Sequence, residues 1–265
     1  MIPAETIERC RVYAGRSRET TDSMSPEPAQ RLSVLLGAAL GQHLPLCWHW
    51  AYFNNAVKPE DTGHDGHERL GLFLPDVPLP RRMWASGEIE VLRQLDIGEP
   101  ATRHSQIEEV TFKPGRSGDL CFVTLRHDIE QGQLCIVERQ TIVYRQQGRP
   151  ETALRSSDEP VPQGYIVVPD STVLAYSAIT QNGHRIHWDR DFCRDVESYP
   201  DLVVHGPLLA TLLAQELDKE PKPCRFQYRA KAPVFVTSPF RIEKSGSTAR
   251  IMRSDGVEAM FAEYF

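Results

Sequence analysis

The sequence contains no apolar run that approaches the length of about 20 residues needed to cross a bilayer. Its first residues, Met1-Ile2-Pro3-Ala4-Glu5, also lack the basic stretch followed by an apolar stretch that marks a secretory signal. We therefore expect a protein that works in the cytoplasm and has no membrane partner.

Paired cysteine motifs are also missing, because no two cysteines are spaced as C-x-x-C. We expect these residues to be reduced thiols, with neither a zinc site nor a disulfide framework. They are Cys10, Cys47, Cys121, Cys135, Cys193 and Cys224.

An excess of positive charge is the third absence, since the formal net charge is −6. Nucleic-acid binding depends on neutralising phosphates, so this balance argues against a nucleic-acid partner. It leaves room for a small polyanionic ligand held by a local basic patch. The length of 265 residues suits one large domain or two ordinary ones.

Helical spacing of apolar residues predicts a helix over Pro3–Ala14 and a second helix that starts at Pro26. The polar stretch Thr20–Ser25 between them is predicted to be a loop. The aromatic segment Leu44–Phe53 favours a core position, with an acyl pocket as the alternative. Three prolines make Phe73–Trp84 an extended connector.

Alternation of apolar and polar residues then predicts four long strands, separated by Gly- and Pro-containing turns. We expect them to form an antiparallel meander. Their ranges are Glu88–Leu95, Thr102–Lys113, Leu120–Ile129 and Leu134–Arg145.

The second half repeats this plan after a polar linker at Gln146–Gly164. Ser171–Thr180 is predicted to be a strand and Pro207–Leu217 a buried helix. Four alternating runs follow: Arg225–Val236, Phe240–Ser245, Ala249–Arg253 and Val257–Phe265. The chain therefore resolves into two similar α+β units, 1–150 and 160–265, without a residue-level repeat.

Two motifs in the second unit carry chemistry. Asn182, His184 and His187 lie close together in N-G-H-R-I-H-W-D, and His205-Gly206 precedes a proline that starts the predicted helix. A helix start presents free backbone N–H groups and the positive end of a dipole. A histidine loop facing it could form and stabilise an oxyanion.

The first motif resembles the signature of the MaoC-like (R)-hydratase family, with Tyr176 as its aromatic residue, Thr180 as its Ser/Thr and His187 as its histidine. Asn182 stands where the usual catalytic Asp would be, and His184 and Arg185 replace its Asn and Pro. These changes, with W-H-W-x-Y-F and P-L-P-R-R-M-W in the first unit, resemble the mesaconyl-CoA and itaconyl-CoA hydratases and the mitochondrial-type 3-hydroxyacyl-thioester dehydratases. The resemblance covers nearly the whole chain.

The resemblance implies an α+β double hot dog, in which two antiparallel sheets each wrap around a helix. The first unit would bind the acyl-CoA without catalysing, and the second would carry the catalytic loop and central helix. The implied reaction is hydration of a short unsaturated dicarboxylyl-CoA, such as itaconyl-CoA or mesaconyl-CoA. Alternatives are dehydration of 3-hydroxyacyl groups on acyl carrier protein, thioester hydrolysis, and acyl-CoA binding without catalysis.

Hydration requires a base for water and a donor for the enolate oxygen. We expect His187 to be the base, because imidazole titrates near neutral pH. Asn182 either binds the attacking water or caps its own loop. Gly206 offers its backbone N–H as the oxyanion donor, or is simply a residue small enough for the helix entry.

The substrate would also touch Tyr176, His184, Arg185 and His205, although a structural role is favoured for His205. Arg81 and Arg82, beside Trp84, would pair with the free carboxylate of the acyl group, or else fix the connector by ion pairs. The phosphates of coenzyme A would meet a row of basic residues on one strand face, unless this is an ordinary solvated face. The row comprises Arg225, Arg229 and Lys231.

The spacing H-x-x-H occurs twice, at His64/His67 and His184/His187, but neither pair lies on a clear helix with a third ligand. We therefore expect no metal and no cofactor other than the coenzyme A thioester of the substrate. We also expect a homodimer or a larger homo-oligomer.

Overall fold

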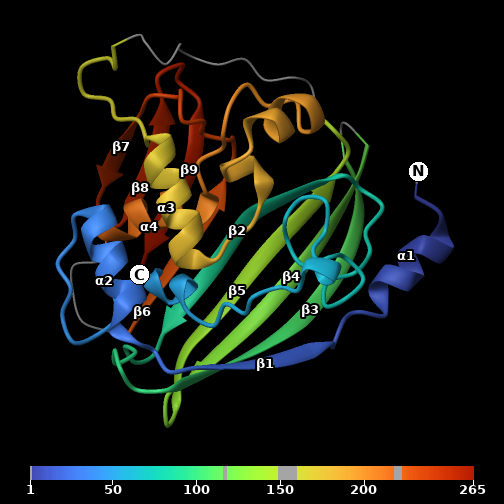
Figure 1. Cartoon of the computed structure of the whole chain (residues 1–265), viewed down its shortest axis with the longest axis horizontal. Coiled ribbons are helices and arrows are strands. Elements are labelled where there is room, and N and C mark those ends of the chain that lie inside the picture. Colours follow the sequence, from blue (N-terminus) through green and yellow to red (C-terminus); the bar gives the residue numbers. More distant parts are fainter. Residues whose placement is uncertain (1, 116–117, 149–159, 218–222) are drawn as a thin grey trace.

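A computed structural model describes residues 2–115, 118–148, 160–217 and 223–265. The helices of this part are α1 (Ala4–Arg11), α2 (Pro26–Leu36), α3 (Asp170–Thr180) and α4 (Gly206–Leu217), shown in Figure 1. Its strands are β1 (Ser17–Asp22), β2 (Arg81–Val91), β3 (Ala101–Gly115), β4 (Gly118–Glu130), β5 (Leu134–Arg145), β6 (Cys224–Ala230), β7 (Phe240–Ser245), β8 (Thr248–Arg253) and β9 (Glu258–Tyr264). Shorter helical segments are Trp48–Ala51, Pro59–Asp61, Arg185–His187 and Phe192–Val196.

The strands form one nine-stranded sheet in the order β1-β3-β4-β5-β2-β6-β9-β8-β7. In each half the first long strand returns beside the last, so that β2 pairs with β5 and β6 pairs with β9. The strands β2 and β6 also pair antiparallel with each other, from Ser86 opposite Arg229 to Val91 opposite Cys224. The expected two sheets are therefore joined edge to edge. The strand order β2-β5-β4-β3 on one side of this pair corresponds to the order β6-β9-β8-β7 on the other.

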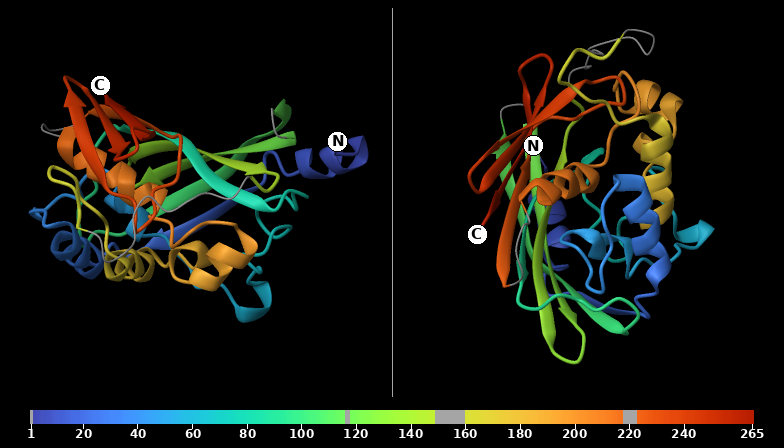
Figure 2. Two further views of the ribbon diagram at one scale, coloured as in Figure 1. Left: turned by 90° about the horizontal axis from the view of Figure 1, so that it is seen from above. Right: turned by 90° about the vertical axis from the view of Figure 1, so that its left-hand side faces the viewer.

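Helices α2, α3 and α4 lie on one side of the sheet in two layers (Figure 2). Helix α4 packs directly on β6, β8 and β9, whereas α2 and α3 pack against each other farther from the sheet (Figure 2). The residues of α4 that face this core include Leu209, Leu213 and Leu217, all buried. Burial of this apolar stripe stabilises the C-terminal half around its central helix, as expected.

The N-terminal half has a different filling. The Pro-rich connector contributes buried Phe73, Leu74, Val77 and Leu79, which pack with apolar residues of β3, β4 and β5. Proline lacks an N–H group and disrupts a helix interior, so the prolines of this stretch explain why it is extended. In each half, the segment just before the first long strand packs on the sheet. In the N-terminal half this segment is extended, whereas in the C-terminal half it is helix α4.

Several element predictions are confirmed, including α1, α2, α4 and strands β3 to β5 and β7 to β9. The strand predicted at Arg225–Val236 is confirmed only as far as Ala230, where β6 ends. Three are wrong. Ser171–Thr180 belongs to helix α3, Thr20–Asp22 belongs to the polar edge strand β1, and the strand predicted at Glu88 already starts at Arg81. The predicted four-stranded meander is confirmed only for β3, β4 and β5, which pair in chain order, because β2 pairs with β5 and not with β3. Residues 149–159 of the predicted linker lie outside the described part of the chain.

All six cysteines are buried free thiols. Within the described residues, none of the helices has the length and apolar character that a membrane span would need.

Candidate active site

His187 ends the short helical turn Arg185–His187 and is buried, with 5% of its surface exposed. Its Nδ1 atom lies 2.7 Å from the backbone carbonyl of Val203. A carbonyl can only accept, so Nδ1 carries the hydrogen and Nε2 keeps its lone pair. Burial lowers the pKa of His187 to about 3, which keeps the imidazole neutral at neutral pH. The residue is therefore held unprotonated with Nε2 free to accept a proton, but its pKa is no longer near neutral pH, the property on which the prediction of a base rested.

His205 lies directly against this ring. The two imidazoles are stacked with their centroids 3.6 Å apart, and His205 is completely buried. The Nε2 atom of His205 is 2.8 Å from Oγ of Ser177, while Nδ1 has no hydrogen-bond partner among the described residues. The ring of Tyr176 also packs on His205, with the centroids 4.9 Å apart. His205 thus contacts the rings of both His187 and Tyr176, and the structural role favoured for it stays a prediction.

Gly206 begins helix α4 and touches Trp84 of strand β2. A Cβ atom added at Gly206 would lie 2.7 Å from Cε3 of Trp84, so a larger residue would displace the indole. Within the described part of the chain, no acceptor contacts the N–H of Gly206. Both sequence interpretations are compatible with this geometry, since the residue must be small and its N–H can donate to a ligand.

Asn182 adopts the capping role. Its Oδ1 atom accepts a hydrogen bond of 3.0 Å from the backbone N–H of His184. This contact tightens the turn that presents His184 and His187. The interpretation of Asn182 as a water ligand stays a prediction.

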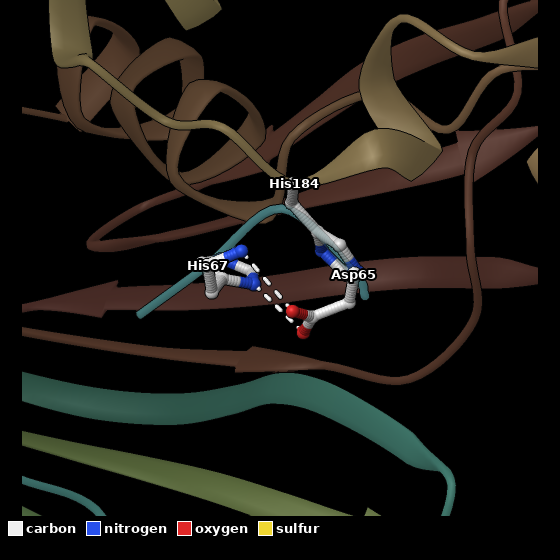
Figure 3. A group of neighbouring side chains, drawn as sticks. All are labelled: Asp65, His67 and His184. Atoms are coloured by element: carbon white, nitrogen blue, oxygen red, sulfur yellow. Dashed lines mark hydrogen bonds and ion pairs between the residues drawn. The ribbon is translucent and has the colours of Figure 1, made fainter. Parts of the chain in front are cut away.

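A loop from the N-terminal half completes the neighbourhood. The rings of His67 and His184 lie 4.4 Å apart, and the carboxylate of Asp65 is 3.0 Å from Nδ1 of His67 (Figure 3). The backbone N–H of Arg185 donates to the carbonyl of Asp65 at 2.8 Å. Asp65 was not predicted as a site residue and His67 only as half of an H-x-x-H pair, although their Asp-Gly-His spacing repeats the Asn-Gly-His of the loop that carries His187.

These residues are also the ones that could hold a metal ion. One ligand atom from each of Asp65, His67 and His184 lies within 4.8 Å of the others. Two histidines and a carboxylate form a ligand set that transition metals use. Burial and then the positive charge of Arg82 lower the pKa of His67 to about 4. The same charge of Arg82 opposes the binding of a cation at this position.

The two arginines of the connector have different surroundings. Arg81 is 2% exposed, its Nε atom lies 3.2 Å from the carboxylate of Glu197, and its guanidinium covers the ring of Tyr199. Arg81 therefore has the ion-pair role that was the alternative for it. Arg82 is half-buried and forms no ion pair within the described residues, but the Asp65 carboxylate is near enough that, after His67, the charge of Arg82 helps to lower the pKa of Asp65. Because side chains alternate along β2, Arg82 lies on the same face as Trp84, at the start of α4.

Aromatic rings line this face beyond Gly206. Trp84 stacks on Tyr228 at 4.3 Å and meets the edge of Trp50 at 5.4 Å. The indole N–H of Trp50 donates to the buried carboxylate of Glu138 at 2.8 Å. The predicted core role of the aromatic segment is thereby confirmed for Trp48, Tyr52 and Phe53, which are buried, and Trp50 joins this wall.

The remaining predicted residues are not brought to His187. The guanidinium of Arg185 pairs with Asp189 at 2.6 Å. The basic row of β6 is exposed and alternates with buried Phe226 and Tyr228, so it points away from the face that carries α4. Lys231 additionally pairs with Glu258. A role of Arg225, Arg229 and Lys231 in binding coenzyme A stays a prediction.

Comparison with known proteins relates this geometry to a family. A family model described as hydroxyacyl-thioester dehydratase type 2 matches residues 47–236. The chain belongs to this family. The match spans both the aromatic segment of the N-terminal half and the catalytic loop with helix α4.

Two curated relatives are similar over most of their length. The mesaconyl-C(4)-CoA hydratase of Chloroflexus aurantiacus is 44% identical over 243 residues, which cover 87% of this chain and 86% of the relative. The mitochondrial hydroxyacyl-thioester dehydratase type 2 of Schizosaccharomyces pombe is 28% identical, with 83% and 87% covered. This chain is thus a hydratase or dehydratase of acyl thioesters.

Solved structures show the fold. HtdX of Mycobacterium tuberculosis superimposes with a TM-score of 0.69 at 16% identity, over 94% of this chain and 99% of that one. A second protein from the same organism, described as a double hotdog fold, gives a TM-score of 0.53 at 13% identity, with 95% and 96% covered. The expected α+β double hot dog is confirmed.

Proposed function

We propose that the protein hydrates a short, branched, unsaturated dicarboxylyl-CoA, with mesaconyl-CoA and itaconyl-CoA as the leading candidates. The observation that carries this proposal is Arg82, a half-buried cation without an ion-pair partner in the described residues, beside the histidines of the site. A guanidinium in such surroundings can bind the free carboxylate of an acyl group bidentately. The name of the Chloroflexus aurantiacus relative supports the same substrate class.

The reaction uses groups already held in position. Nε2 of His187 removes one proton from water while the water oxygen bonds to the β-carbon of the enoyl thioester. The π electrons move to the thioester oxygen as an enolate, which accepts the hydrogen bond of the Gly206 N–H. His187 then returns the proton to the α-carbon, so the enzyme ends in its initial state. No step requires a metal or a further cofactor.

The aromatic wall supports a short acyl group over a long one. Trp84, Trp50 and Tyr228 occupy the space next to Gly206, and Tyr228 is itself buried. A dehydratase for fatty acyl chains would need an apolar tunnel in this direction. Dehydration of a short 3-hydroxyacyl thioester stays available, because addition and elimination of water are the same reaction in opposite directions.

A substrate panel tests the proposal. Rates of hydration should be measured with mesaconyl-CoA, itaconyl-CoA, crotonyl-CoA and a long-chain enoyl-CoA. We expect the highest kcat/KM with one of the dicarboxylyl substrates. A preference for the long chain would contradict the proposal, and binding of all four without turnover would favour a non-catalytic acyl-CoA-binding protein.

A further inference from the structure

Two turns of the same design meet at the active site, one from each half of the chain. They are Asp65-Gly66-His67 and Asn182-Gly183-His184. In each, the first side chain accepts the backbone N–H of its histidine, at 3.1 Å for His67 and 3.0 Å for His184. The turns thus present two imidazoles from one shared backbone geometry.

The turns are docked back to back through their glycines. A Cβ atom added to Gly66 would lie 2.0 Å from the carbonyl oxygen of Gly183, and one added to Gly183 would lie 2.5 Å from that of Gly66. Gly66 also has a positive φ of 89°, which favours glycine. This contact fixes His67 relative to the catalytic loop.

The turns differ in their first residue. The neutral Asn182 contacts only the backbone of His184 through its Oδ1 atom, whereas Asp65 also contacts the ring of His67, with Oδ2 3.0 Å from Nδ1. Because an ionised carboxylate can only accept, Nδ1 of His67 carries the hydrogen and Nε2 keeps a lone pair. This is the state that the carbonyl of Val203 imposes on His187.

The imidazoles of His67 and His187 both lie near the ring of His184. The ring of His184 lies 4.4 Å from that of His67 and 5.5 Å from that of His187. The side chain of His67 is 23% exposed, so it is accessible to a small molecule from the site.

We propose that His67, oriented by Asp65, is a second acceptor that holds the attacking water in the hydration reaction on which this inference rests. Nε2 of His187 takes one proton of the water, and Nε2 of His67 accepts a hydrogen bond from the other hydrogen. That hydrogen stays on the oxygen as the C–O bond forms, and the proton on His187 moves to the α-carbon. Neither imidazole changes its charge over the cycle, and the water is oriented at two points instead of one.

The same atoms suit a metal ion, so the test must separate the two functions. The described contacts favour the water-binding role, since both carboxylate oxygens of Asp65 already accept from His67. A metal would instead bind to His67 and His184 together with that carboxylate.

The experiment compares His67→Ala and Asp65→Asn with His64→Ala in the full-length protein. His64 lies in the same loop but is exposed; its backbone carbonyl accepts from Arg185, and its ring lies 6.3 Å from that of Phe192, away from His67 and His187 in the contacts described. With the best substrate of the panel, we expect His67→Ala to lower kcat about a hundredfold with little change in KM. Asp65→Asn should lower kcat less, because an amide oxygen can still accept from Nδ1. His64→Ala should behave as wild type, and all three variants should keep the melting temperature of the wild type.

Three further results would overturn the inference. The first is a kcat of His67→Ala within about twofold of His64→Ala, below the effect expected of a water-orienting group. The second is a loss of melting temperature with parallel changes in kcat and KM, which would make the pair structural. The third is stoichiometric metal in the purified wild type that is lost in both variants, together with activity that a chelator abolishes. A wild type inactive on the whole panel would instead overturn the proposed function, and this inference with it.

Discussion

At the scale of single residues, the states of His187 and His67 are each set by the acceptor that the Nδ1 atom contacts. His187 contacts a backbone carbonyl, which orients the ring without adding a charge. Replacing His187 by Ala should lower kcat about a hundred- to ten-thousandfold, as expected for the loss of a general base. The exposed His104, paired with Glu19 on the surface, provides a control whose replacement by Ala should leave kcat unchanged. If His187→Ala retained half of the wild-type rate, the base would have to be another residue.

Arg81 and Arg82 form a matched pair for the substrate assignment. Arg82→Ala should reduce the ratio of kcat/KM for mesaconyl-CoA over crotonyl-CoA by about ten- to a hundredfold, because only the first substrate carries the free charge. Arg81→Ala should instead destabilise the fold by about 3–5 kcal/mol, since it leaves the Glu197 carboxylate without its buried partner. Substrate ratios and denaturant unfolding of both variants check this contrast. An unchanged ratio of kcat/KM in Arg82→Ala would show that Arg82 does not bind the free carboxylate of the substrate.

At the scale of elements, the start of α4 and the strand β2 depend on each other through one contact. Gly206→Ala should cost about 1–3 kcal/mol of folding free energy, because the new Cβ atom would overlap the indole of Trp84. In a Trp84→Leu background the same change should cost at least about 1 kcal/mol less, since the overlapping ring is gone. A double-mutant cycle by urea unfolding measures the difference. Additive effects would show that the helix start adjusts independently of the strand.

Local patterns were sufficient for the elements with a strong period. The long strands β3, β4 and β5 alternate apolar and polar residues, and α4 carries a continuous buried stripe. Helix α3 was predicted as a strand, and it does contain the β-branched residues Thr172, Val173 and Thr180, which are enriched in strands. Its buried residues Val173, Tyr176, Ser177 and Thr180 instead follow helical spacing, and Pro169 precedes its first turn. Edge strand β1 has a single buried residue, Thr20, so no alternation was there to detect.

The periodicity of one segment does not specify which distant strands pair. This pairing nevertheless decides which residues meet at the site. The loop motif identified His187 and Gly206, both on the C-terminal half. Asp65 and His67 reach them only because the two halves share one sheet through β2 and β6, a contact that neither strand's own sequence specifies. The different roles of Arg81 and Arg82 likewise follow from their opposite faces of β2, once Arg81 is known to start that strand.

At the scale of the whole molecule, the buried histidines make the fold sensitive to acid. Burial lowers the pKa of His67 and His127 to about 4 and of His187 to about 3, and it holds the pKa values of His184 and His205 well below 6.5. The unfolded chain therefore binds more protons than the folded one below about pH 6.5, and stability is lost as the pH falls from there. Five such groups should together cost about 5 kcal/mol between pH 6.5 and 5.5. Urea unfolding at the two pH values measures the change, and equal free energies of unfolding would contradict it.

The width of the shared sheet has a consequence for solubility. Joining β2 to β6 removes one edge from each half, so the described sheet ends only at β1 and β7. Both outer strands carry charges, Arg18, Glu19 and Asp22 on the first and Arg241, Glu243 and Lys244 on the second. Charged edge strands resist pairing with the backbone of another chain, which is how many β-rich proteins avoid aggregation. Fusing the halves thus buries the central strand edges and leaves at the margins only strands that are poor templates for further growth of the sheet.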